Sequence, residues 1–124
     1  MGKLKLNVLS ARNLHISPNT PLKNEARLRA ITRIGPSYPF SSKIHIATSN
    51  ACNFHESEVI EFSEDQIMCF DICLATFPLS TLGSFDIQLS NIADDKMVDN
   101  WFDLENEDHE KVGEVHLKIE LVGD

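Results

Sequence analysis

Lys3–Leu9, which reads Lys-Leu-Lys-Leu-Asn-Val-Leu, decides the fold because polar and apolar residues alternate along it. A period of two places every second side chain on one face, so the segment predicts a half-buried β-strand. No stretch of ten residues has helical periodicity, and only Ala93–Asn100 has room for one helical turn, with Asp94 and Asp95 suiting its N-terminal end. Seven further strands are predicted along the chain, at Ala26–Ile34, Lys43–Thr48, Val59–Phe62, Gln66–Leu74, Ser84–Leu89, Trp101–Leu104 and Gly113–Val122.

Eight short strands separated by Gly, Pro and Asn predict an all-β fold, an antiparallel eight-stranded β-sandwich with Greek-key connections. Gln66–Leu74 is almost continuously apolar, which indicates a central strand. The length of 124 residues, with 42% hydrophobic residues, fits one domain over residues 1–124. Whether that domain is a piece of a longer protein, and whether it self-associates, stays open.

The cysteines and the N-terminus indicate a reduced, intracellular protein. Cys52, Cys69 and Cys73 are odd in number, and the start of the chain lacks the continuous apolar run of a secretory signal. Cys69 and Cys73 are four residues apart in a predicted strand, so we expect both on one face, packed in the core instead of binding metal. We expect a cytoplasmic location, with peripheral attachment to a membrane or a cytoskeletal structure as a further expectation.

Charge is distributed very unevenly along the sequence. Residues 1–55 carry eight Lys or Arg residues and one acid, a balance of +7. Residues 56–124 carry three Lys or Arg residues and eighteen acids, a balance of −15. The total is −8. The chain is polarised along its sequence, and the order of the strands decides whether it is also polarised in space.

Several short motifs, in order along nearly the whole chain, resemble those of C2 domains. They are Leu4-x-Leu6-x-Val8-x-x-Ala11-Arg12-Asn13-Leu14, Thr48–Glu56 leading to Phe62, Leu82-Gly83-Ser84 with Ile87-x-Leu89, Trp101-x-x-Leu104, and Gly113-Glu114-Val115-x-Leu117-x-Ile119. Thr48–Glu56 departs from the family turn, because Ala51 replaces a proline and one residue is added. The resemblance implies two four-stranded sheets in the permuted, type II topology.

The resemblance also implies three loops at one end of the sandwich, at His15–Glu25, Ser49–His55 and Ala75–Leu82. Calcium-sensing members of the family hold the ion with Asp carboxylates from the first and third loops, since Ca²⁺ takes six to eight oxygen ligands. Here the first loop offers only Glu25, the third has no acid, and Asp71 lies within a predicted strand. We therefore expect no calcium binding of the family type, no metal site and no cofactor.

The sequence gives no support to catalysis or to nucleic-acid binding. The five histidines fall in different predicted elements, and there is no nucleophile elbow, phosphate loop or His-Glu-x-x-His pair, so we expect a non-enzyme. A pI of about 5.0 and the absence of aromatic residues among the basic ones disfavour nucleic acid. Acids between Asp94 and Glu110 are expected to form a solvated surface, with a basic partner as the alternative.

Two functions remain. We rank slightly first a protein-interaction module that docks a partner of a larger assembly through a polarised charged surface. Such charge also allows head-to-tail self-association. The alternative is calcium-independent binding of anionic phospholipids or phosphoinositides, which the family binds on a concave sheet face. The residues that carry these hypotheses are a basic patch of Arg27, Arg29, Arg33, Lys43 and His45, expected on one face of two paired strands, and loop-tip contacts at Ile16, Phe77 and Leu79.

Overall fold

The computed structural model describes the backbone of residues 2–123 and the side chains of these residues except 93–95 and 123. Strands account for most of this chain, and one short helix joins two of them. The elements in chain order are β1 (Gly2–Arg12), β2 (His15–Ser17), β3 (Thr20–Pro21), β4 (Arg27–Ile34), β5 (Ser37–Ser41), β6 (His45–Ile46), β7 (Cys52–Phe62), β8 (Ile67–Leu74), β9 (Ser80–Gln88), α1 (Leu89–Asp95), β10 (Met97–Glu105) and β11 (Lys111–Gly123).

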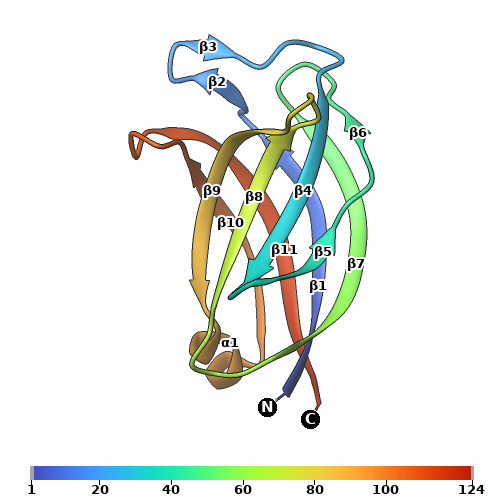
Figure 1. The fold of residues 1–124 in the computed structure, drawn as a ribbon, viewed down its shortest axis with the longest axis vertical. Coiled ribbons are helices and arrows are strands. Elements are labelled where there is room, and N and C mark those ends of the chain that lie inside the picture. The colour runs from blue at the N-terminus through green and yellow to red at the C-terminus, as the bar shows by residue number, and fades with distance from the viewer. Residues whose placement is uncertain (1, 124) are drawn as a thin grey trace.

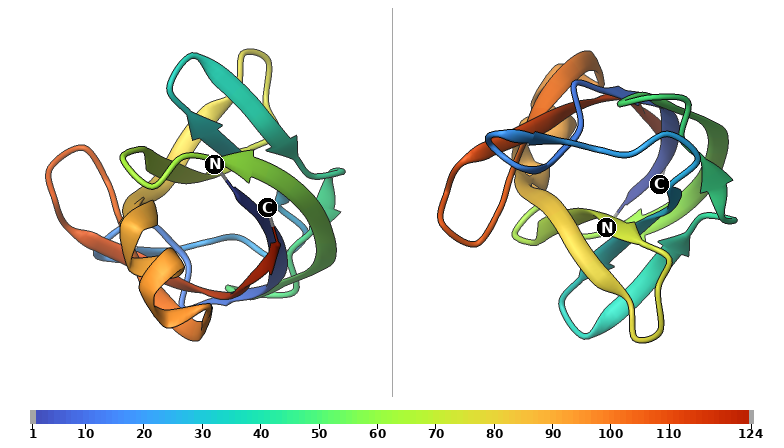
Figure 2. Two further views of the ribbon diagram at one scale, coloured as in Figure 1. Left: turned by 90° about the horizontal axis from the view of Figure 1, so that it is seen from below. Right: turned by 90° about the horizontal axis from the view of Figure 1, so that it is seen from above.

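The strands form an antiparallel β-sandwich, as the sequence predicts. One layer has the order β4, β8, β9 with β5 and β6 both paired to the outer edge of β4, and the other has the order β10, β11, β1, β7. A single residue pair, Glu105 with Ser84, joins β10 to β9 and links the layers along one side. Figure 1 shows the two layers face to face, and Figure 2 shows the nearly closed cross-section from both ends.

Alternation builds the core in the way that the sequence predicts. Leu4, Leu6 and Val8 of β1 are fully buried, and the residues between them lie on the outer face. The nearly apolar segment is the central strand β8, which pairs with β4 on one side and β9 on the other. Its inner face contributes the fully buried Met68 and Phe70 to the core between the sheets.

The joint between the layers depends on Gly83 in β9. A Cβ atom at this position would lie 2.7 Å from Cγ2 of Val112 and 3.0 Å from Cβ of Leu104. Both neighbours are fully buried. Only a residue without a side chain lets β9 approach β10 and β11 this closely.

Several predicted element boundaries are wrong. The predicted strand Lys43–Thr48 is reduced to the two residues of β6, His45–Ile46. The predicted loop Ser49–His55 is mostly strand, because β7 already begins at Cys52. Its polar residues are the exposed positions of a strand whose buried partners are Cys52 and Phe54. The predicted loop Ala75–Leu82 ends earlier, because Ser80 pairs with Leu74 and starts β9.

The helix also differs from its predicted position. It spans Leu89–Asp95 instead of a turn within Ala93–Asn100, and its fully buried Leu89 and Ile92 lie three residues apart on one face. Asp94 and Asp95 are therefore the last residues of the helix and not its first. β10 starts at Met97, directly after a left-handed Lys96, so the final hairpin is longer than predicted.

Three connections lie together at the end of the sandwich opposite both termini (Figure 1). They are the β1–β4 connection with its β2–β3 hairpin, the β6–β7 connection and the β8–β9 turn. Backbone hydrogen bonds tie the first two together, from Leu14 N to Asn50 O at 2.9 Å and from Glu25 N to Ala47 O at 2.9 Å. The three connections thus lie at one end of the sandwich, as the resemblance implied.

Candidate functional site

The outer face of β4 carries the three predicted arginines. Arg27 and Arg33 are exposed and Arg29 is half-buried, while the alternate residues Leu28 and Ala30 are buried in the core. The alternation of basic and apolar residues in the sequence therefore predicts the side of the strand correctly for all three.

The edge strand next to β4 has an irregular register. Ser42 pairs with Ala30 through two hydrogen bonds, from Ser42 N to Ala30 O at 2.8 Å and from Ala30 N to Ser42 Oγ at 2.8 Å. Three residues later, His45 is opposite Leu28, which is only two residues from Ala30. One additional residue on the edge strand thus lies opposite Arg29, which is the count of a β-bulge and reverses which side chains face outward.

Because of this bulge, the prediction that His45 shares the arginine face is wrong. His45 lies opposite buried Leu28, and its ring packs edge-on against Phe54 of β7 at 5.1 Å between centroids. Its Nε2 contacts the Glu56 carboxylate, which also accepts a hydrogen bond from Lys43 N at 3.0 Å. Lys43 is exposed, but its neighbourhood is shared with an acid. The predicted five-residue patch is therefore divided.

Arg33 is also flanked by acids. It is opposite Cys69 and donates from Nη2 to Cys69 Sγ at 3.5 Å, while Asp71 and Asp86 lie on the neighbouring positions of β8 and β9. Burial raises the pKa of Asp71 above its usual value, and the charge of Arg33 opposes that shift. The positive charge of Arg33 is partly neutralised within the fold.

The two strand cysteines share one face, as predicted, but that face is not the core. Cys69 is opposite Arg33 and Cys73 is opposite Arg29, so both lie on the face of the sheet that carries the arginines. Burial raises the pKa of both thiols above the usual value. Side chains alternate between the two faces of β8, and the core face is occupied by the residues that alternate with the two cysteines.

Arg29 has a different environment. It lines a cavity of about 430 Å³ with Ile44 and five consecutive residues of the β8–β9 turn, Ala75 to Leu79. Its guanidinium makes no hydrogen bond or ion pair with any side chain that the structure describes, and its Nε is buried without a partner. Leaving a buried donor unpaired costs about 1–3 kcal/mol. Arg29 is thus a cation at an apolar cavity that the fold itself does not compensate.

Exposed apolar side chains surround this arginine. Phe77 is fully exposed, at 104% of its reference area, Ile46 is 60% exposed, and Ile44 and Leu79 are close to half exposed. Ile46 is paired with Arg27 across the edge of the sheet, which makes the patch continuous. We call this surface the Arg29 face, which comprises Arg27, Arg29, Ile44, Ile46, Phe77 and Leu79.

The third predicted loop-tip contact, Ile16, lies elsewhere. It is 45% exposed on β2, in the hairpin of the β1–β4 connection. The hairpin lies at the same end of the sandwich as the β8–β9 turn, but the two are apart from each other across that end (Figures 1 and 2). Ile16 is therefore not part of the Arg29 face.

Charge separation along the sequence is largely lost in space around β1. The topology inserts this N-terminal strand between the acidic β7 and β11, a strand with two Lys and two Glu residues, so Lys3 is opposite Glu61 and Lys5 is opposite Glu120. Arg12 is paired with Glu114 at 2.9 Å between Nε and Oε1. The basic charge of β1 is therefore largely neutralised by neighbouring acids.

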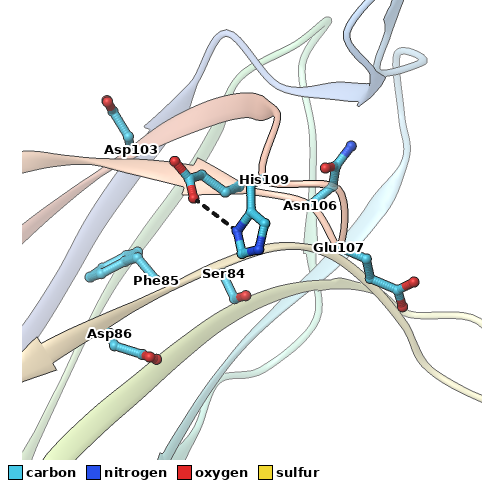
Figure 3. Close-up of a pocket in the computed structure, with 8 residues that line it drawn as sticks. Ser84, Phe85, Asp86, Asp103, Asn106, Glu107 and His109 are labelled. Atoms are coloured by element: carbon cyan, nitrogen blue, oxygen red, sulfur yellow. Dashed lines mark ion pairs between the residues drawn. The ribbon is translucent and has the colours of Figure 1, made fainter.

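An acidic cavity lies at the seam between β9 and β10. It measures about 480 Å³ and is lined by Ser84, Phe85, Asp86, Asp103, Glu105, Asn106, Glu107 and His109. Figure 3 shows the one ion pair within it, between His109 and Glu105, with 3.7 Å between Nδ1 and Oε1. Among the residues the structure describes, no three His, Cys, Asp or Glu side chains are grouped as metal ligands.

Phe85 and Phe102 close the inner side of this seam, with stacked rings 5.0 Å apart. The aromatic contact belongs to the junction between the layers.

Within residues 2–123, no helix is long and apolar enough to span a bilayer.

Comparisons with known proteins identify the fold but give no relative in sequence. No family model matches the chain, and no curated protein matches it. Solved structures do match. A C2 domain-containing protein superposes with a TM-score of 0.81 at 14% identity over 99% of this chain and 90% of the other.

Two Extended-Synaptotagmin structures match in the same way. A single C2 domain of plant Extended Synaptotagmin 1 gives a TM-score of 0.75 at 12% identity, covering 99% of this chain and 95% of the other. An Extended-Synaptotagmin 2 structure with an SMP domain and two C2 domains gives 0.77 at 21% identity, covering 98% of this chain but only 27% of the other. The chain has the C2 fold.

Proposed function

We propose that this C2-fold domain is a calcium-independent protein-interaction module that docks a partner of a larger assembly through the Arg29 face. The observation that carries the proposal is the cavity at Arg29, where a guanidinium without a counter-ion is surrounded by exposed apolar side chains. Arginine, aromatic and aliphatic residues that converge on a pocket are the composition of interface hot spots. The proposal assigns no catalytic role to the domain.

Calcium independence in the proposal rests on the composition of the three loops. Glu25 is the one acid in the predicted loop segments of residues 15–25 and 75–82. Its backbone N–H donates to Ala47 O, and its φ is +67°. A single carboxylate is too few to hold Ca²⁺.

The expected binding free energy favours a protein partner over an anionic membrane. Arg33 lies beside Asp71 and Asp86, which leaves Arg27, Arg29 and Lys43 as cations of the predicted patch. Three basic residues contribute about 3 kcal/mol at an anionic surface, whereas millimolar binding already needs about 4 kcal/mol. The net charge of −8 opposes the approach to such a surface.

Membrane attachment is the second candidate, because one observation favours it. Phe77 stands fully exposed on the β8–β9 turn, where an aromatic ring can enter the interfacial layer of a bilayer. Burying that ring adds about 1.5–3 kcal/mol, which brings weak peripheral binding within reach at membranes rich in anionic lipid.

Affinity capture from an extract of the source cells, followed by binding of the purified candidate, tests the proposal. The double variant Phe77→Glu/Ile46→Glu places two acids on the Arg29 face. Val59→Glu is the matched control, because Val59 is 53% exposed on β7 of the other sheet. The partner is expected to bind the wild type and the control equally, with chelator or with calcium, and to lose at least about tenfold in affinity for the double variant, or about 1.4 kcal/mol.

Sedimentation with phosphoinositide-containing vesicles is the second arm of this test. Calcium-independent pelleting that the double variant abolishes, with no protein partner recovered, would overturn docking in favour of membrane attachment. A partner that binds both variants equally would show that the domain docks through another surface.

A further inference from the structure

The cavity beside Arg29 is specific enough to indicate what it accepts. Its walls are apolar at Ile44, Ala75 and Phe77 to Leu79, and its one side-chain hydroxyl, Thr76 Oγ1, already donates to Pro78 O at 2.7 Å. The guanidinium of Arg29 is the remaining side-chain donor at this site. The occupant must therefore combine an apolar body with one anionic group.

We propose that this cavity binds the C-terminal residue of a partner polypeptide, with its free carboxylate on Arg29 and an apolar side chain against Ile44, Phe77 and Leu79. The inference rests on the proposed function, since it names the part of the partner that the Arg29 face recognises.

The charge of the site matches a carboxylate. One guanidinium lines the cavity, and it pairs a monoanion in the planar, two-bond geometry that arginine and carboxylate share. A phosphate monoester, such as a phosphorylated side chain or a phosphoinositide ring phosphate, carries nearly two negative charges at neutral pH. In a site with apolar walls the second charge would have no counter-ion, which is costly.

The polar content of the site favours a chain end over an internal acidic side chain. An internal Asp or Glu brings peptide groups on both sides, and the apolar walls offer them no side-chain partner. A terminal residue carries its carboxylate and its side chain on one Cα atom and has a single flanking peptide. A volume of about 430 Å³ lies at the lower end of the range for ligand pockets, which suits one or two residues.

NMR titration of the isotope-labelled domain tests the inference directly. The probe is a pool of pentapeptides with a free carboxylate and all amino acids at the last two positions, and the matched pool is amidated at the C-terminus. The free-acid pool is expected to shift the Arg29 Nε–H signal and the amides of Ala75 and Thr76. The amidated pool is expected to bind at least tenfold more weakly.

Two variants of the same strand keep the test independent of folding. Arg29→Gln is expected to abolish the response to the free-acid pool while leaving the remaining amide spectrum in place. Arg33→Gln is the matched control, because Arg33 is exposed on the same face of β4 but neither lines the cavity nor belongs to the Arg29 face. Its response is expected to match that of the wild type within about twofold.

The possible outcomes separate this inference from the proposed function. Equal binding of free and amidated pools, or no response from either pool, overturns carboxylate recognition. Shifts of the same signals caused only by phosphoinositide micelles also overturn it and assign the cavity to a lipid headgroup. If the carboxylate test fails while a purified partner still requires Phe77 and Ile46, the inference falls and docking stands.

Discussion

Replacing Gly83 by alanine is expected to weaken the joint between the two layers. The added Cβ would lie 2.7 Å from Val112 Cγ2, closer than Cβ atoms approach their neighbours in folded proteins, and 3.0 Å from Leu104 Cβ, which is tighter than most such contacts. The Leu104 atom is next to its backbone, and Val112 is fully buried, so neither neighbour can withdraw without moving the sheet.

The expected cost follows from two opposing effects. Overpacking a filled site costs about 1–3 kcal/mol, and replacing glycine by alanine in a strand returns roughly 0.5–1 kcal/mol through the unfolded chain. The net loss is about 1–2 kcal/mol. For a chain of 124 residues this lowers the melting temperature by about 4–8 °C.

Thermal and urea unfolding of Gly83→Ala, Val112→Ala and the double variant measure this cost. Because Val112→Ala removes the atom that the new methyl group meets, the two changes are expected to couple favourably by about 1 kcal/mol. Ser84→Ala is the matched control in the same strand, with a change within about 0.5 kcal/mol. Wild-type stability of Gly83→Ala, or simple additivity in the double variant, would refute the close approach at the seam.

Three other predictions concern individual polar groups. Thr32 is fully buried and its hydroxyl has no partner among the described residues, so Thr32→Val is expected to raise the free energy of unfolding by about 1 kcal/mol in urea titrations, and a loss of that size would contradict it. Arg29→Met removes an uncompensated buried Nε, and we expect unchanged or slightly higher stability by calorimetry together with loss of partner binding; a loss of stability above about 1 kcal/mol would show that Arg29 is structural. Hydrogen bonds from Arg12 and Lys111 hold the pKa of Glu114 below its usual value. Its stabilising effect is therefore fully present above the pKa of the unfolded chain and is lost as pH falls through the lower folded pKa, so the wild type should lose more stability in acid than Glu114→Gln, and parallel curves would contradict the pairing.

The layers and the core could be predicted from sequence because they depend on alternation alone. Leu4, Leu6 and Val8 repeat with the period of a strand, and the apolar run that became β8 fits only the centre of a sheet. The strand ends were harder. Polar Asn53 looks like a loop residue, although it is an exposed position within β7.

The bulge beside Arg29 could not be predicted in the same way. The sequence Lys43-Ile44-His45-Ile46 alternates equally well in either register, so it does not say which pair faces outward. The structure gives the outer positions to Ile44 and Ile46 because one additional residue follows Ser42. That single residue turns an expected basic patch into a mixed surface of arginine and isoleucine.

The distribution of charge illustrates the same limit. The sequence balance predicts a polarised molecule only if neighbours in sequence remain neighbours in space. Antiparallel pairing instead places Lys3 and Lys5 of β1 beside acids from distant strands. Local patterns determine which face a residue occupies, whereas the pairing of distant strands determines which charges meet.

Photo-crosslinking from position 77 tests docking through the Arg29 face most directly. The domain carries p-benzoylphenylalanine in place of Phe77, and a control carries it in place of Ile67, which is exposed near the other end of β8. In an extract that retains its membranes, with calcium chelated, we predict a discrete protein adduct from position 77 that Arg29→Gln removes and that position 67 does not form. Adducts to lipid alone, or a protein adduct that persists with Arg29→Gln, would contradict the account.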